Sequence, residues 1–463
     1  MVLAACSGSP GSIPVTQRTE NSMLHAGGSS PISHVIVIIQ ENRTFDNMFH
    51  GFPGANTVNS AKGKDGKTYT LAPIPLEYKK LDPRHDHPQF LEDYDQGKDD
   101  GFNNEIVKYR MGSGCSDYLN HPSCWVFSNQ QWVKQAIYSY VQPTDVQEYW
   151  TLAQQYALGD NAFASNNGPT YVAHQYLIAG ESGHASEVPS AQPWGCDGPA
   201  SETVELLAYG QANPPVFSKA TGHEVPGPFP CFTYPTIANN LDGAGISWTY
   251  YVEAQNPGGN LNAFTSIQQI YKGPDWKNIS SPDTNILKDI SNGTLANVSW
   301  VMPSGSNSDH AGPASGNKGP SWVGSIANAI GQSKYWNSSA IIVMWDDWGG
   351  WYDHVHPPQY LAPHGAREGL GFRVPLIVIS PYAKAGYISH QQHEIASTLR
   401  FIEETFGLGF IGNGSEAYAD QRADGFNDMF NFSQRPRTYK PIPVKYDAHY
   451  FLTHPDRTPA DDY

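Results

Sequence analysis

Two uninterrupted runs of β-branched and other apolar residues constrain the fold most strongly. Residues 35–39 read VIVII and residues 341–345 read IIVMW, with no polar residue inside either run. A strand with one exposed face alternates apolar and polar residues, whereas a central strand of a parallel sheet is buried on both faces. The two runs therefore predict central strands of a mostly parallel sheet.

Further segments extend this pattern along the chain. Residues 373–383 and 245–252 read as additional strands, and helical patterns lie at 144–157, 321–331 and 391–406. Buried strands that alternate with helices favour the α/β class, here an α/β sandwich around a mostly parallel central sheet.

Polar stretches rich in Gly and Pro interrupt the pattern. We expect long loop insertions near 51–130 and 180–235, and a loop-like tail after about residue 412. Residues 33–463 are predicted to form one domain, preceded by a tether at 1–32.

Charge and hydropathy exclude several classes of protein. The chain has 463 residues, 28 Lys and Arg against 44 Asp and Glu, and a net charge of −16, which argues against nucleic acid as a partner. The hydrophobic fraction of 39% is that of a folded protein rather than a disordered one. No apolar stretch is long enough to predict a transmembrane helix.

The N-terminus and the cysteines indicate export. Leu3-Ala4-Ala5-Cys6 resembles the end of a bacterial lipoprotein signal, so a periplasmic or cell-envelope location is expected, with membrane contact only through a lipid anchor at Cys6. The alternative is a chance match after the start methionine. Four other cysteines allow three disulfide pairings, and the short loop between Cys115 and Cys124 favours that pair and leaves Cys196 with Cys231. The alternative is four separate buried thiols.

Polar side chains follow both central strands. Glu41 and Asn42 come just after the first run, and Asp346 and Asp347 just after the second. Ligands of parallel sheets bind beyond the carboxyl ends of the strands, and two adjacent carboxylates repel each other unless a cation lies between them. A donor set of oxygens alone favours Ca²⁺, Mg²⁺ or Mn²⁺ over Zn²⁺. The alternative is that these side chains cap a helix and a turn.

Thr170 is a candidate nucleophile. It follows Gly168-Pro169 in a turn, and the residues after it read as a helix. A hydroxyl at a helix start lies beside free backbone N–H groups, where an anion is favoured, and a nearby metal would lower its pKa. The alternative is an ordinary N-cap residue.

Histidines in three polar segments complete the set of candidates. His85 and His87 lie in DPRHDHPQF, His310 lies in SGSNSDHAGP, and His354 lies in WYDHVHPP. Imidazoles donate hydrogen bonds to phosphoryl oxygens and protonate leaving groups. Taken singly, each is an ordinary loop histidine, and His354 can equally be a structural partner of the aspartate before it.

Five segments in order resemble one family. HVIVIIQENRTFDNMFHGFPG, HDHPQFLEDYDQGKDDGF, NNGPTY, SDHAG and VMWDDWGGWYDHVHPP are similar to segments of the bacterial phosphoesterases that comprise phosphatidylcholine-type phospholipases C and a group of acid phosphatases. That family is a branch of the alkaline phosphatase-like superfamily. The resemblance runs from about residue 33 to about residue 410.

The resemblance implies roles for the candidate residues. One divalent metal ion would be held by the residues that match the family ligands, which are Glu41, Asn42, Thr170, Asp346 and Asp347. Thr170 would be the nucleophile that becomes transiently phosphorylated, and His310 and His85 would bind phosphoryl oxygens and serve the leaving group. His85 matches better than His87 because its spacing to GKDDGF agrees. His354 is carried over as a neighbour of the site. A further family histidine near 235–255 has no match, since that stretch offers Trp248 and Tyr250 instead.

The resemblance also implies a substrate class. We expect a broad-specificity acid phosphatase that acts on small phosphomonoesters through a phosphothreonine, because the C-terminal domains typical of the phospholipase branch are missing from this sequence. The alternative is a phospholipase C, with a phospholipid headgroup framed by the loop tryptophans Trp125, Trp132, Trp150 and Trp194. A non-catalytic ligand-binding protein is a third reading, disfavoured by the retained hydroxyl, aspartates and histidines.

Overall fold

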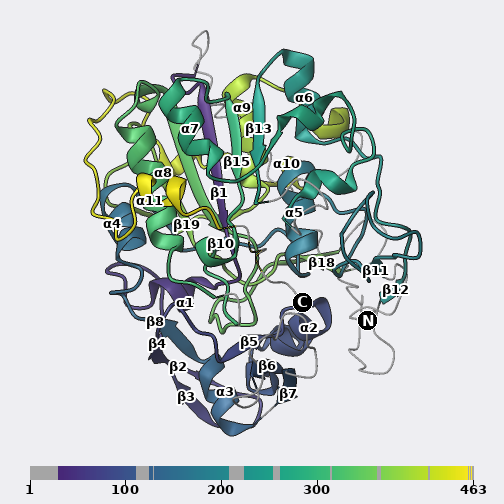
Figure 1. Ribbon diagram of the computed structural model, residues 1–463. Helices are drawn as coiled ribbons and strands as arrows, with labels where there is room; N and C mark the ends of the chain where they lie inside the picture. The colour runs from purple at the N-terminus through teal and green to yellow at the C-terminus, as the bar shows by residue number, and fades with distance from the viewer. Residues whose placement is uncertain are drawn as a thin grey trace, which may run out of the picture.

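An eight-stranded sheet forms the centre of the molecule (Figure 1). The computed structural model describes residues 30–110, 125–128, 130–207, 224–253, 261–312, 315–361, 367–414, 418–456, 458 and 460. In sheet order the strands are β14 (Ile279–Ser280), β13 (Trp248–Tyr251), β15 (Val298–Val301), β1 (His34–Gln40), β16 (Ser339–Trp345), β19 (Leu376–Ile379), β9 (Ala157–Gly159) and β20 (Tyr387–Ser389).

The sheet is mostly parallel, as predicted. β1 lies between β15 and β16 and runs parallel to both, so that Ile38 is opposite Val301 on one side and Val343 on the other. β19 is the exception: it runs antiparallel to β16 and to β9. The segment at 373–383 is therefore a strand, but shorter than predicted and opposite in direction to its neighbours.

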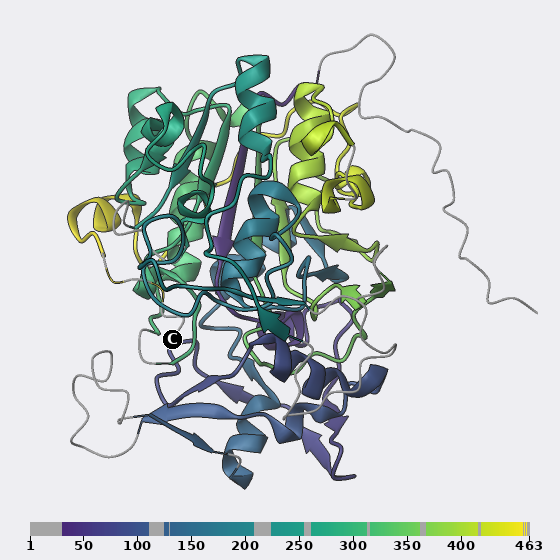
Figure 2. The same cartoon turned by 90° about the vertical axis from the view of Figure 1, so that its right-hand side faces the viewer.

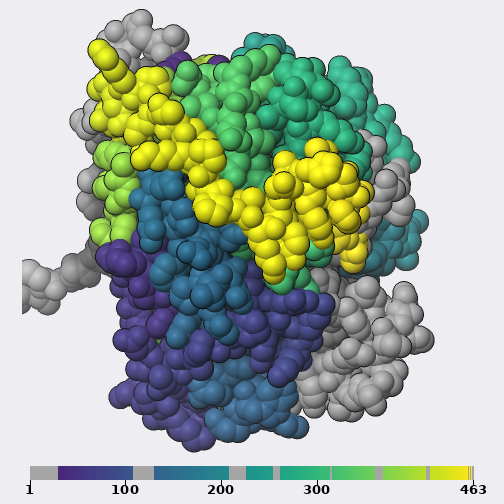
Figure 3. Space-filling view, turned by 60° about the vertical axis from the view of Figure 1, so that its left-hand side comes forward, coloured from purple at the N-terminus to yellow at the C-terminus, as the bar shows by residue number. Residues whose placement is uncertain are grey.

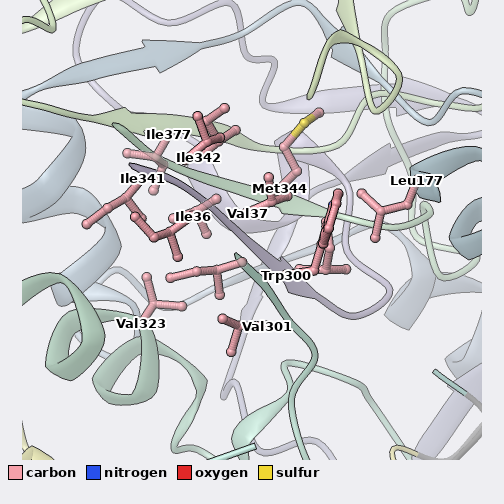
Figure 4. Close-up of a cluster of buried hydrophobic side chains, with 14 of the residues drawn as sticks. Ile36, Val37, Leu177, Trp300, Val301, Val323, Ile341, Ile342, Met344 and Ile377 are labelled. Atoms are coloured by element: carbon pink, nitrogen blue, oxygen red, sulfur yellow. The ribbon is translucent and has the colours of Figure 1, made fainter. Parts of the chain in front are cut away.

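Helices cover both faces of the sheet. α8 (Gly319–Gly331) contacts α4 (Gln147–Gln155), α7 (Asn285–Asn292) and α11 (Ala448–Thr453). A second group comprises α5 (Thr170–Ala179), α6 (Ile237–Ala244), α9 (Ser397–Phe406) and α10 (Ala419–Arg422). Figure 4 shows Val323 of α8 and Leu177 of α5 on opposite sides of the strand side chains. The α/β sandwich predicted from the sequence is confirmed.

Burial on both faces explains the two apolar runs. Ile36, Val37, Ile341 and Ile342 are all fully buried, and Figure 4 shows them in one cluster with Trp300. Successive side chains of a strand point to opposite faces, so a strand covered by helices on both sides needs apolar residues at every position. Such burial contributes roughly 1.5–3 kcal/mol for each of these side chains.

The segment predicted as a loop insertion at 51–130 contains regular structure. Together with the residues that follow it, it forms the lobe at the bottom of Figure 1, which Figure 2 shows from the side. A second hydrophobic cluster holds it together and joins Phe90 and Phe102 to Trp348, Trp351 and Phe372 from the main body. The elements that begin or build this lobe are α1 (Phe45–Phe49), β2 (Ser60–Lys62), β3 (Thr68–Thr70), β4 (Ala72–Ile74), β5 (Leu81–Pro83), α2 (His87–Tyr94), β6 (Val107–Arg110), β7 (Trp125–Ser128), α3 (Gln131–Ile137) and β8 (Ser139–Val141).

Short strands and one disulfide order the remaining loops. The strands are β10 (Ala162–Phe163), β11 (Glu205–Leu207), β12 (Glu224–Pro226), β17 (Gln359–Leu361), β18 (Arg367–Gly369) and β21 (His393–Glu394). The disulfide between Cys196 and Cys231 is present, which confirms that predicted pair. Cys6, Cys115 and Cys124 lie outside the described residues. The domain boundaries drawn from the sequence stay a prediction.

The C-terminal segment lies against the outside of the main body (Figure 3). Asn328 Nδ2 of α8 donates to Ile442 O at 3.0 Å, and Ser325 Oγ donates to Tyr446 O at 2.8 Å. The tail is thus mostly irregular, as predicted, yet hydrogen-bonded to the helix it crosses. None of the helices described is both long and apolar enough to span a bilayer.

Candidate active site

The polar residues that follow β1 and β16 meet at one edge of the sheet. Gln40 pairs with Trp345 at the ends of these parallel strands, so the residues that follow the two strands lie side by side. Asn42 N donates to Asp346 Oδ1 at 3.0 Å. Glu41, Asn42, Asp346 and Asp347 are all at most 1% exposed. The four residues therefore lie together at one edge of the sheet, and their role as metal ligands stays a prediction.

Two unusual backbone conformations hold this edge together. Asn42 has φ of 57°, in the left-handed region that costs energy for a residue with a side chain. Gly349, at φ of +59°, donates its N–H to Asp347 Oδ1 at 2.7 Å. A Cβ on Gly349 would lie 2.2 Å from Asn42 O, so only glycine lets the two loops approach this closely.

Thr170 faces these side chains from the first turn of a helix. α5 begins at Thr170, after Pro169 in an extended conformation. Thr170 Oγ1 lies 3.2 Å from Asp347 Oδ2 and 3.4 Å from Asn42 Oδ1, and the residue is fully buried. The hydroxyl hydrogen therefore has a carboxylate acceptor within reach.

His85 comes to the same place from the lower lobe. Its Nδ1 lies 2.9 Å from Pro83 O, and because a carbonyl only accepts, this nitrogen carries the hydrogen. Its Nε2 then accepts from Asn42 Nδ2 at 3.0 Å. His87 points elsewhere, with Nδ1 3.1 Å from Asn167 Oδ1. The structure thus places His85, rather than His87, in the Thr170 network.

His310 lies next to His85, and a buried hydrogen bond from Arg43 holds its loop. The two imidazole centroids are 5.9 Å apart, and His310 Nδ1 is hydrogen-bonded to Ala311 O. Arg43 Nε donates to Asp309 O at 2.8 Å, directly before His310. Burial raises the pKa of Asp309 to about 7, although its hydrogen bond from Tyr149 partly offsets this effect.

His354 belongs to a separate ionic cluster. Its Nδ1 lies 2.6 Å from Asp46 Oδ2, and Arg373 Nη2 lies 3.3 Å from Asp46 Oδ1. Arg373 Nε also donates to Asp353 Oδ1 at 2.7 Å. Arg373 thus supplies one positive charge that both buried aspartates share. The contacts of His354 are those of a structural residue, and its catalytic role stays a prediction.

His174 is a residue of the site that the sequence reasoning missed. Its Nε2 lies 3.7 Å from Glu41 Oε1 and 3.9 Å from Asp346 Oδ2, and it is 1% exposed. The signal was present in the sequence, since residues four apart on a helix share a face and His174 follows Thr170 by four on α5.

A divalent metal fits the residues at this edge. One ligand atom from each of Glu41, His174 and Asp346 lies within 4.8 Å of the others, and all three residues are buried. Two buried carboxylates side by side carry a charge that a cation offsets. His174 thus offers a nitrogen atom beside the oxygens expected from the sequence.

The aromatic residues proposed to frame a headgroup have other contacts. The Trp150 ring packs 5.2 Å from Phe52, and its Nε1 donates to Met48 O. Trp194 is 3% exposed and packs edge-on against Tyr171. Trp132 is exposed on α3, and the side chain of Trp125 lies outside the described part. Trp150 and Trp194 are thus used in packing.

Two proteins named as phospholipases C are similar to this chain in sequence. The "Non-hemolytic phospholipase C" of Burkholderia pseudomallei is 25% identical over 93% of this chain and 62% of its own length. The protein of the same name from Pseudomonas aeruginosa is 24% identical over 82% of this chain and 55% of its own. The chain therefore spans little more than half the length of these relatives.

The chain also matches a solved structure and a family model. A solved structure from Vibrio parahaemolyticus, described as a protein in the alkaline phosphatase superfamily, covers 65% of this chain and 67% of its own, with a TM-score of 0.34 and 14% identity. The model of the Phosphoesterase family matches residues 32–409, which is most of the chain. The chain belongs to the Phosphoesterase family.

Proposed function

We propose that this protein is a metal-dependent phosphoester hydrolase that uses Thr170 as its nucleophile. One observation carries the proposal: the Thr170 hydroxyl lies at the start of α5, 3.2 Å from Asp347 Oδ2, beside the acidic edge of the sheet. A buried hydroxyl next to a carboxylate acceptor, a helix N-terminus and a metal-binding set is the arrangement that nucleophilic phosphoryl transfer requires.

The metal would be held by the oxygens that converge at this edge. Glu41, Asn42, Asp346 and Asp347 are the proposed ligands, together with Thr170 itself. A divalent ion bound here supplies positive charge that offsets the charge of the phosphoryl group and favours the ionised hydroxyl.

The proposed reaction has two displacements at phosphorus, the first by Thr170 and the second by water. Asp347 Oδ2 is placed to accept the proton of Thr170 as Oγ1 forms a bond to phosphorus and the bond to the leaving alkoxide breaks. His85 and His310 are proposed to bind phosphoryl oxygens through Nε2–H in the imidazolium form, because Nδ1 of each ring already faces a backbone carbonyl. The leaving alkoxide takes up a proton from one of these histidines or from water. Water then attacks the phosphothreonine and gives up a proton to a histidine or to solvent, while the bond between phosphorus and Oγ1 breaks. Asp347 returns its proton to Oγ1, and inorganic phosphate leaves.

The substrate class we favour is a small phosphomonoester, with an acidic pH optimum. The packing of Trp150 against Phe52 and of Trp194 against Tyr171 supports this choice, because both rings are engaged in contacts within the protein. The second candidate is a phospholipase C, and the names of the similar enzymes favour it.

Hydrolysis assays distinguish these candidates. We would compare p-nitrophenyl phosphate with p-nitrophenyl phosphorylcholine from pH 4 to 9, with and without a chelator. Chelator-sensitive release from the monoester, strongest at acid pH, is the expected result, whereas release mainly from the choline ester would identify a phospholipase C. No release from either after metal is restored would favour a non-catalytic binding protein.

Variants at the nucleophile test the role of Thr170. Thr170→Ala should abolish turnover, while Thr170→Ser keeps a hydroxyl and should retain measurable activity. Full activity in the alanine variant would overturn the assignment.

We also propose that the protein is exported and anchored by a lipid at Cys6. The disulfide between Cys196 and Cys231 supports an oxidising compartment. Fractionation of cells that express the wild type or Cys6→Ser tests the anchor, because only the wild type should sediment with membranes. Equal sedimentation of both would contradict it.

A further inference from the structure

The imidazole of His174 has one nitrogen whose role is fixed by its surroundings. Nδ1 lies 3.1 Å from Leu261 O, and since a carbonyl oxygen only accepts, Nδ1 carries a hydrogen. Tyr250 OH donates to the same carbonyl at 2.8 Å. Leu261 O therefore orients the ring, and the lone pair of the neutral imidazole is on Nε2.

That lone pair faces two carboxylates. Nε2 lies 3.7 Å from Glu41 Oε1 and 3.9 Å from Asp346 Oδ2. These distances exceed the roughly 2.7–2.9 Å of a charge-assisted hydrogen bond. Two ligands bound about 2.1 Å from one ion, at angles between tetrahedral and about 140°, are roughly 3.4–4.0 Å apart. The spacing is therefore that of ligands that share a cation.

A metal-binding histidine commonly donates its other ring nitrogen to a backbone carbonyl, which fixes the ring and its tautomer. His174 has this arrangement through Leu261. It also lies on the same face of α5 as Thr170, so one helix would present both the hydroxyl and the imidazole to the acidic edge.

We propose that His174 Nε2 is a direct ligand of the metal ion, with Tyr250 and Leu261 positioning the ring. The inference rests on the proposed function and goes beyond it, because a nitrogen ligand changes which ion the site selects. Imidazole suits Fe²⁺, Co²⁺ or Zn²⁺, and Mn²⁺, which also binds oxygen ligands, accepts it more readily than Ca²⁺ does.

Electron spin-echo measurements on the Mn²⁺-loaded protein test this directly. A coordinated imidazole gives ¹⁴N modulation of the Mn²⁺ echo, which a merely structural histidine does not. The wild type should show this modulation, and His174→Gln should lose it while Mn²⁺ affinity falls about 10- to 100-fold. His310→Gln, which removes another buried histidine of the site, is the matched control and should keep the modulation.

Binding selectivity provides a second readout. Titration calorimetry with Mn²⁺ and Ca²⁺ should show the wild type preferring Mn²⁺, and His174→Gln should lose most of that preference. Persistence of the ¹⁴N modulation in His174→Gln would overturn the proposal, as would an unchanged Mn²⁺ affinity. If this variant does not fold, His174→Glu exchanges nitrogen for oxygen, and retained modulation there would have the same meaning.

The outcomes also separate this inference from the proposed function. A wild type that hydrolyses phosphoesters with bound Mn²⁺ but shows no nitrogen modulation overturns the inference alone. A wild type that binds no divalent ion and hydrolyses nothing overturns both.

Discussion

Gly349 is the position where a single added methyl group should disturb the site most predictably. Its φ of +59° lies in the left-handed region, which costs an alanine about 1–2 kcal/mol. The new Cβ would stand 2.2 Å from Asn42 O, and the closest comfortable contact is about 3.4 Å. The Asn42 peptide or the Gly349 loop must therefore move by about 1.2 Å.

The displacement acts on the residues that would bind metal and substrate. Asn42 N donates to Asp346 and its side chain contacts both Thr170 and His85. Since a misplacement of about 1 Å can cost about 100-fold in rate, Gly349→Ala should lower kcat/KM by about that factor. Added overpacking of about 1–3 kcal/mol brings the total loss of folding stability to about 2–5 kcal/mol.

Thermal unfolding and steady-state kinetics check both numbers. Gly243→Ala is the matched control, because Gly243 lies in α6 and a Cβ there meets nothing within 4 Å. This variant should keep full activity, and its free energy of unfolding should rise by up to about 1 kcal/mol because alanine has the better helix propensity. The reasoning is refuted if Gly349→Ala stays within about threefold of the wild-type kcat/KM and melts at the same temperature as the wild type.

Three further predictions concern the buried charges and the metal. Arg373→Met leaves Asp46 and Asp353 buried without their cation, so urea denaturation should show a loss of about 3–5 kcal/mol, and an unchanged midpoint would contradict the cluster described here. Burial, reinforced by nearby Asp420, raises the pKa of Glu403 to about 9, so the native state keeps a proton that the unfolded chain releases near pH 4.5. Stability should then fall as pH rises between these values by up to about 1.4 kcal/mol per pH unit, and Glu403→Gln should remove that slope in unfolding curves at pH 5, 7 and 8.5; an equal slope in both proteins would show that Glu403 ionises normally. Dialysis against a chelator should lower the melting temperature in calorimetry, because an ion at 100 times its Kd stabilises the fold by about 2.7 kcal/mol, and no change on adding back Mn²⁺ or Zn²⁺ would argue against a site in the native state.

The central strands were predictable because burial on both faces requires an apolar residue at every position. Residues 35–39 and 341–345 have no polar position, and both became neighbouring strands of the sheet. β15 was missed because Ser299 interrupts its apolar sequence, although that serine is fully buried. The strand at 376–379 was found without its direction, since periodicity reports burial but not the sense of the chain.

The candidate site was predictable in part for a related reason. Polar residues after two adjacent parallel strands must lie near each other, which brought Glu41, Asn42, Asp346 and Asp347 together. His174 follows no strand, so this reasoning did not reach it, and the only signal for it was its spacing of four residues from Thr170. The lower lobe was also hidden, since its core is completed by Trp348 and Trp351, which are far from it in sequence.

The pairing of β1 with β16 has a consequence for how the chain folds as it is made. Asn42 and Asp346 are 304 residues apart, yet β1 has β16 as one of its two neighbours. At about 5–20 residues per second, a ribosome needs about 15–60 s to make the intervening chain. Until β15 is made, VIVII has neither of its partner strands and is an apolar segment prone to aggregate. The acidic edge of the sheet is therefore among the last parts of the molecule to assemble, and metal uptake should follow completion of the chain rather than guide its early folding.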